Sequence, residues 1–164
     1  MGLEIRAAAI GDLDGLLALH KTVSVDPAGL ARSPDEITPA YVESAIGADI
    51  CLLALTTDGV VVGAIHARRE SPALFEHVLG GLTVAVHPDG QGRGVGSALF
   101  QALIARARAL DPPILRIELA TGASNLGAVR LYERLGFQHE GRQIARGRYP
   151  DGQFDDDILM GLLL

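Results

Sequence analysis

A glycine-rich loop between an apolar run and a helical stripe is the feature that most constrains the fold of this chain. Four glycines fall within seven residues of the segment His87-Pro88-Asp89-Gly90-Gln91-Gly92-Arg93-Gly94-Val95-Gly96. The run from about 77 to 86 predicts a central strand, and apolar residues at helical spacing from 95 to 110 predict a helix. Backbone amides converge at such a junction, where the helix start carries partial positive charge. The loop therefore predicts an anion site suited to a pyrophosphate, and Arg93 adds a formal charge.

Two common nucleotide-binding loops do not match this segment. A P-loop needs a lysine directly after its last glycine, but the only lysine of the chain is Lys21, far upstream. The dinucleotide fingerprint Gly-x-Gly-x-x-Gly fails because its last glycine would fall on Val95, Ser97 or Leu99. A kinase, an ATPase and a dinucleotide-binding loop are therefore not expected. The pattern that remains is Gln-x-x-Gly-x-Gly, at Gln91, Gly94 and Gly96.

Periodicity and turn residues divide the rest of the chain into strands and helices. Besides the strand before the glycine loop, strands are expected at 3–8, 50–55, 60–67, 114–120, 138–148 and 154–163. Besides the helix after the loop, helices are expected from Asp12, from Pro39 behind a capping Thr38, and at 125–135. This order predicts a mixed sheet with helices on its faces, of the α/β or α+β class. A length of 164 residues fits a single domain, 1–164.

Glycines also predict local geometry within the sheet. Thr57-Asp58-Gly59 separates two β-rich runs, which predicts an antiparallel hairpin. Gly80 and Gly81 interrupt the strand before the glycine loop, which predicts a bulge or the close approach of another chain or a ligand.

Composition limits the binding partners and the cellular compartment that are expected for this chain. The formal net charge is −6 and no arginine-rich block is present, so nucleic acid is not an expected partner. No stretch approaches about 18 uninterrupted apolar residues, so no membrane span is expected. The only cysteine, Cys51, is expected to be a small buried strand residue, and a chain without a disulfide framework suits the cytoplasm. A core of this size folds without a metal ion, and none is expected.

The glycine loop resembles the central motif of the GNAT N-acetyltransferase family, in which a strand ending in Val-x-Pro precedes Gln/Arg-x-x-Gly-x-Gly/Ala. The matching residues are Val86-His87-Pro88 and Gln91-Gly92-Arg93-Gly94-Val95-Gly96. The resemblance implies acetyl-coenzyme A (acetyl-CoA) as cosubstrate, with its pyrophosphate held by the backbone from Gln91 to Ser97. It also implies that Ala85 and Val86 bond the pantetheine arm as if it were an added strand. A glycine turn used only for tight packing is the alternative.

A second segment strengthens the resemblance. Residues Asn125 to Phe137 are similar to the family motif Asn-x-x-Ala-x-x-Leu-Tyr-x-x-x-Gly-Phe. Phe154, Asp156 and Met160 resemble the closing pattern of the branches that acetylate amino acids and other small molecules. The resemblance thus covers nearly the whole chain. It implies a mixed, mostly antiparallel sheet, here of seven strands with about four helices.

The resemblance also implies roles in catalysis. Asn125 and Tyr132 are seven residues apart, which brings them to nearly the same face of one helix. Tyr132 would be the general acid that protonates the departing thiolate while a primary amine attacks directly in a ternary complex. Asn125 would contact the cofactor, although it also suits a helix N-cap, and Tyr132 also suits a core aromatic. A base is expected because alkylamines enter protonated, and the family often places it near Glu76 and His77, which also suit a solvated loop.

The sequence does not identify the amine that accepts the acetyl group. A small-molecule amine, an amino acid and a protein amino terminus all fit the resemblance. The run Asp155-Asp156-Asp157 suits a solvated loop better than an amine site, and strand alternation would separate Asp156 from its two neighbours. A non-catalytic acyl-CoA sensor on the same fold and a purely structural protein remain as alternatives. The family resemblance allows a homodimer.

Overall fold

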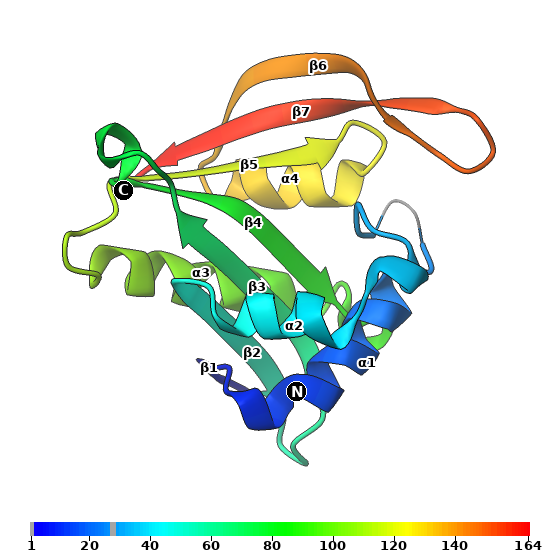
Figure 1. Cartoon of the computed structure of the whole chain (residues 1–164), viewed down its shortest axis with the longest axis vertical. Coiled ribbons are helices and arrows are strands. Elements are labelled where there is room, and N and C mark those ends of the chain that lie inside the picture. Colours follow the sequence, from blue (N-terminus) through cyan, green and yellow to red (C-terminus); the bar gives the residue numbers. More distant parts are fainter. Residues whose placement is uncertain (1, 27–28) are drawn as a thin grey trace.

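The computed structural model describes residues 2–26 and 29–164 (Figure 1). Its helices are α1 Leu13–Val23, α2 Pro39–Ile46, α3 Val95–Arg108 and α4 Leu126–Arg134. Its strands are β1 Leu3–Ala7, β2 Ile50–Thr56, β3 Val61–Arg69, β4 Val78–Val86, β5 Arg116–Gly122, β6 Gln138–Arg148 and β7 Phe154–Leu163. The predicted order of elements and the α/β (α+β) class are confirmed. Three prolines between residues 25 and 39 predict a loop between α1 and α2, of which Pro27 and Ala28 lie outside the described residues.

All of these strands form one sheet, in the order β1-β2-β3-β4-β5-β7-β6. Neighbouring strands are antiparallel except β4 and β5, which run parallel. The expected hairpin joins β2 to β3, and Gly59 takes a φ of 82° in its turn. The mixed, mostly antiparallel sheet implied by the family resemblance is therefore present.

The sheet opens between β4 and β5 (Figure 1). Val78 pairs with Arg116 and Leu79 pairs with Ile117, after which the two strands separate. The edge of β4 that faces β5 therefore lacks a strand partner beyond Leu79. This opening lies at the centre of the sheet, where ligands of α/β proteins commonly bind.

Helices cover both faces of the sheet. α1 and α2 bury Leu16, Leu19 and Val42 on one face. α3 and α4 pack on the other face, where Phe100 and Tyr132 join the larger apolar cluster. Leu79 of β4 lies in the second cluster and Ala85 in the first, although an even number of residues separates them, because the register shift near Gly81 reverses the alternation of the strand.

Two sequence expectations inside the strands are confirmed. The register of β3 against β4 shifts between His66 and Arg68, next to Gly80, and Gly81 has a φ of 54°. The expected bulge is thus present. Cys51 lies in β2 with an exposed fraction of 8%, as a small buried residue.

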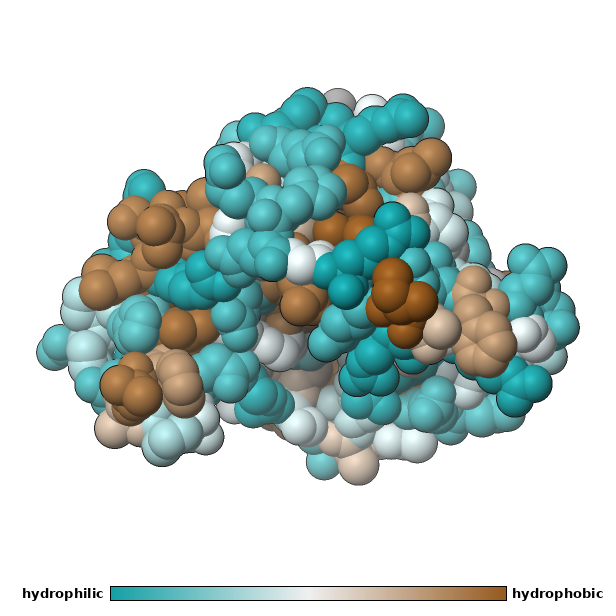
Figure 2. Space-filling view, turned by 90° about the horizontal axis from the view of Figure 1, so that it is seen from above, coloured by the Kyte–Doolittle hydropathy of each residue, from teal (hydrophilic) through white to brown (hydrophobic). Residues whose placement is uncertain are grey.

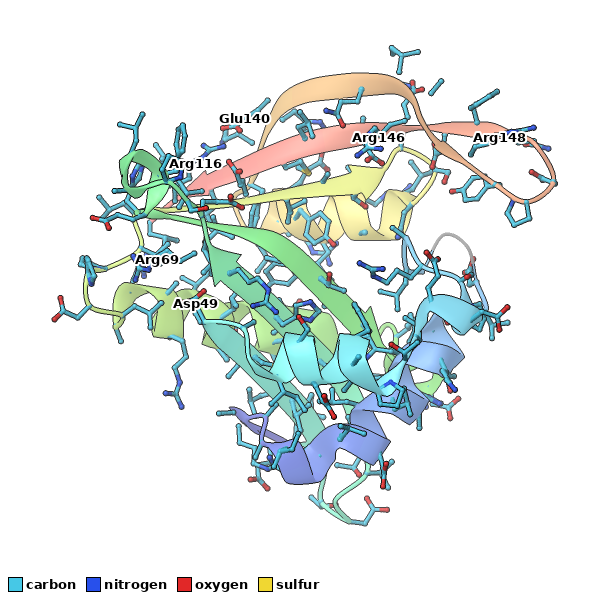
Figure 3. The ribbon with its side chains drawn as sticks, in the orientation of Figure 1. Asp49, Arg69, Arg116, Glu140, Arg146 and Arg148 are labelled. Atoms are coloured by element: carbon cyan, nitrogen blue, oxygen red, sulfur yellow. The ribbon has the colours of Figure 1, made fainter. Side chains whose placement is uncertain are left out.

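Ion pairs hold the outer part of the sheet together. Arg116 of β5 donates to Glu140 of β6 across β7, with 2.8 Å between Nη1 and Oε1 (Figure 3). Polar side chains dominate the face seen from above, with apolar side chains in separate groups (Figure 2). Within residues 2–26 and 29–164, no helix is long and apolar enough to cross a bilayer. The same residues form no group of three or more His, Cys, Asp or Glu side chains placed for a metal ion.

Candidate active site

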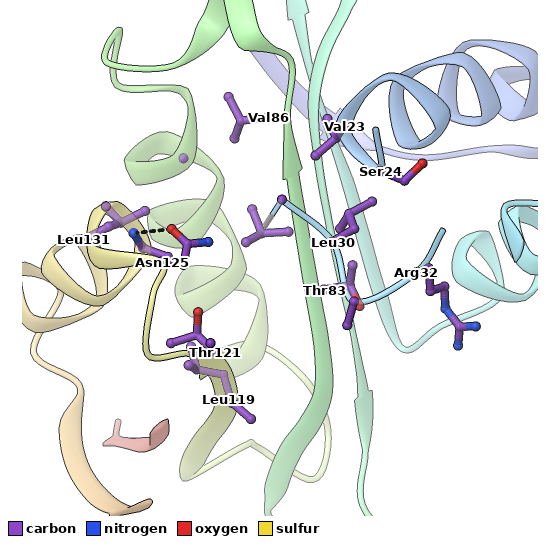
Figure 4. Close-up of a pocket in the computed structure, with 18 of the residues that line it drawn as sticks. Val23, Ser24, Leu30, Arg32, Thr83, Val86, Leu119, Thr121, Asn125 and Leu131 are labelled. Carbon is purple, nitrogen blue, oxygen red and sulfur yellow. Dashed lines mark hydrogen bonds between the residues drawn. The ribbon is translucent and has the colours of Figure 1, made fainter. Parts of the chain in front are cut away.

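A cleft of about 1230 Å³ lies where β4 and β5 separate (Figure 4). Its walls are the C-terminal half of β4, the glycine loop, β5, α4, the connection from α1 to α2, and the turn end of the β6–β7 hairpin. Of the residues predicted for the site, the cleft is lined by Val86, Gln91, Gly92, Gly94, Val95, Gly96, Ser97, Asn125 and Tyr132. The fold therefore brings both sequence motifs to one cavity.

The glycine loop leaves room for a ligand against its backbone. Gly92 and Gly94 have φ values of 69° and 83°, which favour glycine, and a Cβ built on either would meet nothing within 4 Å. Gly94 precedes the first turn of α3. In the described part of the chain, the amides of Gly92, Gly94, Val95, Gly96 and Ser97 donate to no backbone carbonyl. Free amide donors at a helix start are suited to bind an anion.

Other glycines of the loop serve packing. A Cβ at Gly96 would lie 3.1 Å from Leu131 Cδ2, so this glycine lets α4 approach α3. A Cβ at Gly90 would lie 3.3 Å from Val95 Cγ2. Tight packing and an open anion site therefore coexist in the same loop.

The open edge of β4 presents alternate backbone groups to the cleft. The amide of His87 donates to Val62 on β3 at 3.0 Å, so antiparallel alternation turns the groups of Ala85 toward β3 as well. The groups of Val84 and Val86 then face the opening toward β5. The Gln91 side chain lies near this edge, with Nε2 3.5 Å from the Val86 carbonyl oxygen.

Tyr132 lies at the inner end of the cleft. Its ring packs against Phe100 and Phe137, and only 5% of the residue is exposed. Burial raises the pKa of Tyr132 to about 12. The phenol is therefore a proton donor throughout the neutral range, in a position that is both core and cleft wall.

Asn125 caps α4. Its Oδ1 accepts a hydrogen bond from the amide of Ala128 at 3.1 Å (Figure 4). The side chain also lines the cleft, so capping and ligand contact are compatible for this residue. Arg93 is exposed and, like Ala85, is absent from the cleft lining.

Glu76 and His77 lie away from this cleft. Both precede β4, whereas the cleft is lined by the C-terminal half of that strand, from Leu82 onward. Five residues of a strand, from His77 to Leu82, span about 16 Å. His77 instead lines a second pocket of about 700 Å³ with Phe75 and Arg116. The structure therefore does not bring these two residues to Tyr132.

The acidic run lies in β7, which confirms the strand predicted at 154–163 and corrects the expectation of a solvated loop. Asp155 and Asp157 both line the cleft, as alternation predicts, while Asp156 bonds Arg142 at 2.7 Å. The Asp155 carboxylate accepts from the Ser124 hydroxyl at 2.6 Å and from the Tyr149 hydroxyl at 3.0 Å. These bonds, chiefly that from Ser124, lower the pKa of Asp155. They tie the loop before α4 to the β6–β7 hairpin.

Asp157 differs from Asp155 in its surroundings. It pairs with Gly122 of β5 and Gln143 of β6 through its backbone. Its side chain is partly buried in the cleft wall, and it forms no hydrogen bond or ion pair within the described residues. A carboxylate is thus available on the side of the cleft that faces away from α4.

No sequence motif includes Arg32 and Thr83, which line the cleft, or Tyr41, which lies against Arg32. They come from a loop, a helix and a strand, so no spacing in the sequence links them. A lone arginine in a proline-rich loop carries no local signal of its position.

Known proteins support what the geometry indicates. The sequence model of the Acetyltransferase (GNAT) family matches residues 22–137. The L-methionine sulfoximine/L-methionine sulfone acetyltransferase of Pseudomonas aeruginosa is 32% identical over 165 residues, which cover 94% of this chain and 93% of that protein.

Solved structures show the same fold. A GCN5-related N-acetyltransferase from Kribbella flavida has a TM-score of 0.86 at 26% identity, covering 99% of this chain and 98% of that one. An acetyltransferase from Salmonella typhimurium, solved with its cofactor acetyl-CoA, has a TM-score of 0.81 at 24% identity, covering 100% of this chain and 95% of that one. With its two motifs gathered at one cleft, this chain belongs to the GNAT family of acetyltransferases.

Proposed function

We propose that the protein is an acetyl-CoA-dependent N-acetyltransferase that acetylates a primary amine by direct attack in a ternary complex, with Tyr132 as general acid. The observation that carries this proposal is the placement of an open, amide-lined anion site and a buried phenol in one cleft. An acetyltransferase needs both, because one holds the cosubstrate and the other protonates the leaving group.

The residues present fit acetyl-CoA. The open space at Gly92 and Gly94 and the free amides up to Ser97 suit a pyrophosphate. The groups of Val84 and Val86 on the open edge of β4 suit an extended arm that bonds like a strand. We therefore assign that contact to Val84 and Val86 in place of Ala85. Asn125, from the opposite wall, is placed to contact the same ligand.

Acetyl-CoA supplies an acyl thioester that an unprotonated amine can attack. The new N–C bond then replaces the C–S bond. Tyr132 would donate its phenolic proton to the departing sulfur and is re-protonated from solvent, while the acetylated nitrogen gives up one proton. A phenol with a raised pKa holds its proton until a strongly basic thiolate forms beside it.

The incoming amine must also lose the proton that it carries at neutral pH. Glu76 and His77 lie outside the cleft, so we propose Asp157 as the group that receives this proton, directly or through water. By alternation, Asp157 lies on the face of β7 opposite Ile158, which packs in the cluster of Tyr132. Its carboxylate lines the cleft and has no partner in the described residues to compete for the proton.

A non-catalytic acyl-CoA sensor would share the anion site but not the chemistry. The test is to measure thermal stabilisation by acetyl-CoA and, separately, thiol release with a panel of primary amines. We expect stabilisation together with amine-dependent thiol release. Stabilisation without release on any amine would favour the sensor, and the absence of stabilisation would contradict both functions.

A further inference from the structure

The cleft wall formed by the α1–α2 connection carries a cation on an aromatic platform. Arg32 lines the cleft, and its guanidinium carbon lies 4.7 Å from the centroid of the Tyr41 ring. Figure 4 shows Arg32 on the same side of the cleft as Thr83 of β4. A guanidinium stacked on a ring keeps its N–H donors free at its edge.

The platform itself is fixed by its neighbours. Tyr41 lies in the first turn of α2, where its amide donates to the capping Thr38 hydroxyl at 3.2 Å. Its ring meets those of the buried His20 and His66 edge-on, at centroid distances of 5.7 and 6.3 Å. Burial raises the pKa of Tyr41, and the Arg32 charge and hydrogen bonding by Thr83 and Arg32 offset part of that rise. Arg32 is therefore anchored to the face of β4 that borders the opening.

No carboxylate of the described residues forms an ion pair with Arg32, although its charge adds to the Ser33 hydrogen bonds that lower the pKa of Glu36. The nearby Glu36 carboxylate accepts instead from the amide and the hydroxyl of Ser33, at 2.8 and 3.1 Å. The chain carries a net charge of −6, so an unpaired arginine at this cleft is not explained by a basic surface.

We propose that Arg32 binds a carboxylate of the acceptor, so that the enzyme acetylates small amines that also carry a carboxylate, such as free amino acids. This inference rests on the proposed acetyltransferase activity. The planar fork of an arginine matches a carboxylate with two parallel hydrogen bonds, and Tyr41 holds the fork in place. Thr83 borders the same site three residues before Val86, so an acceptor held at Arg32 lies beside the open edge of β4.

The test compares matched acceptors with the full-length protein. Thiol release is measured for several L-amino acids, for their carboxamides, for the amines that lack the carboxylate, and for dipeptides that carry it one residue further from the amine. We expect kcat/KM for the amino acids to exceed that for the carboxamides by about 10- to 100-fold. In Arg32→Gln this preference falls to near unity while KM for acetyl-CoA is unchanged, and Arg32→Lys restores part of it.

Two further variants keep the test specific. Arg106→Gln removes the same charge from an exposed position of α3 outside the cleft and should retain the preference. Arg148, stacked on Phe154 at 5.8 Å, also lines the cleft, and Arg148→Gln tests it as a rival. Equal rates on amino acids and carboxamides, a preference for the dipeptides, or a preference lost in Arg148→Gln but kept in Arg32→Gln would overturn the inference while leaving the acetyltransferase activity intact. Thiol release from no acceptor would instead overturn the proposed function.

Discussion

The ring of Tyr132 lies edge-on to the ring of Phe100, with 5.3 Å between their centroids and 64° between their planes. Phe137 lies 5.9 Å from each of these rings. The three rings fix one another, so the position of the phenol does not depend on its hydroxyl. Replacing Tyr132 with phenylalanine should therefore remove the acid group and keep the packing of the ring.

Tyr132→Phe should lower kcat by about 100-fold or more, because a general acid contributes on that scale. The dissociation constant for acetyl-CoA should stay within about twofold, since the ring packing is kept. With a pKa of about 12, the wild-type phenol stays protonated up to about pH 10, so the rate profile should show no loss from Tyr132 below that pH. Stopped-flow turnover and calorimetric binding check both parts. Equal losses in turnover and affinity would argue against the general-acid role.

Asp157→Asn should lower kcat/KM near pH 7 by about 100-fold, because the amide cannot accept the proton of the incoming ammonium. The deficit should shrink as pH rises toward the pKa of the acceptor, since free amine then becomes available. Asp156→Asn is the matched control, because that carboxylate lies on the opposite face of β7 and bonds Arg142. A pH-independent deficit in Asp157→Asn would rule out this proton-transfer role.

Gly94→Ala should weaken acetyl-CoA binding, since the new methyl group enters the space kept open beside the free amides. Gly59→Ala imposes the same strain without that effect, because Gly59 has a φ of 82° against 83° for Gly94 and also faces open space. Both variants should lose about 1 to 2 kcal/mol of unfolding free energy. Only Gly94→Ala should lose the thermal stabilisation by acetyl-CoA. The same ligand response in both would place the anion elsewhere.

The unfolding free energy should fall between about pH 6.5 and pH 4 because of His66. Burial, aided by the charges of His20, Arg68 and Arg32, lowers its pKa from 6.5 to about 4. In that window the unfolded chain binds a proton and the folded chain does not, which costs up to about 3 kcal/mol. Burial lowers the pKa of His20 too, which adds to the same slope. Urea unfolding of His66→Leu should show a smaller slope than the wild type, and an unchanged slope would contradict this assignment.

Cys51 should resist thiol reagents in the native protein. Burial raises its pKa to about 11, and the thiolate is the reactive form. A colorimetric disulfide reagent should titrate one equivalent in guanidinium chloride but react slowly under native conditions. Fast native labelling would show that β2 opens readily.

The sequence was sufficient for the fold because local signals agreed with one another. Alternation and glycine turns placed every described strand, and the spacing from Val95 to Leu110 placed α3 before the two prolines that follow. The open backbone of the glycine loop before α3 could be predicted for the same reason, because it is formed by consecutive residues.

The acceptor side could not be predicted, because it is assembled from residues that are distant along the chain. Glu76 adjoins β4 in sequence but lies at the wrong end of that strand, and only the direction of β4 relative to the cleft shows this. Asp157 falls in a predicted strand, but the sequence does not show that this strand pairs with β5 at Gly122 and so borders the cleft. Arg32 is held at the cleft by its stacking on Tyr41, nine positions later, and no sequence pattern predicts that contact.

The opening between β4 and β5 has a mechanical consequence. Two residue pairs form the seam that joins the N-terminal four strands to the C-terminal three. An extended arm that hydrogen-bonds to Val84 and Val86 would fill the opening beside this seam and hold the two parts of the sheet together. Amide hydrogen exchange in β5 and α4 should then slow on cosubstrate binding, while β2, paired on both sides, hardly changes. The C-terminal three strands would thus be more rigid when the cosubstrate is bound.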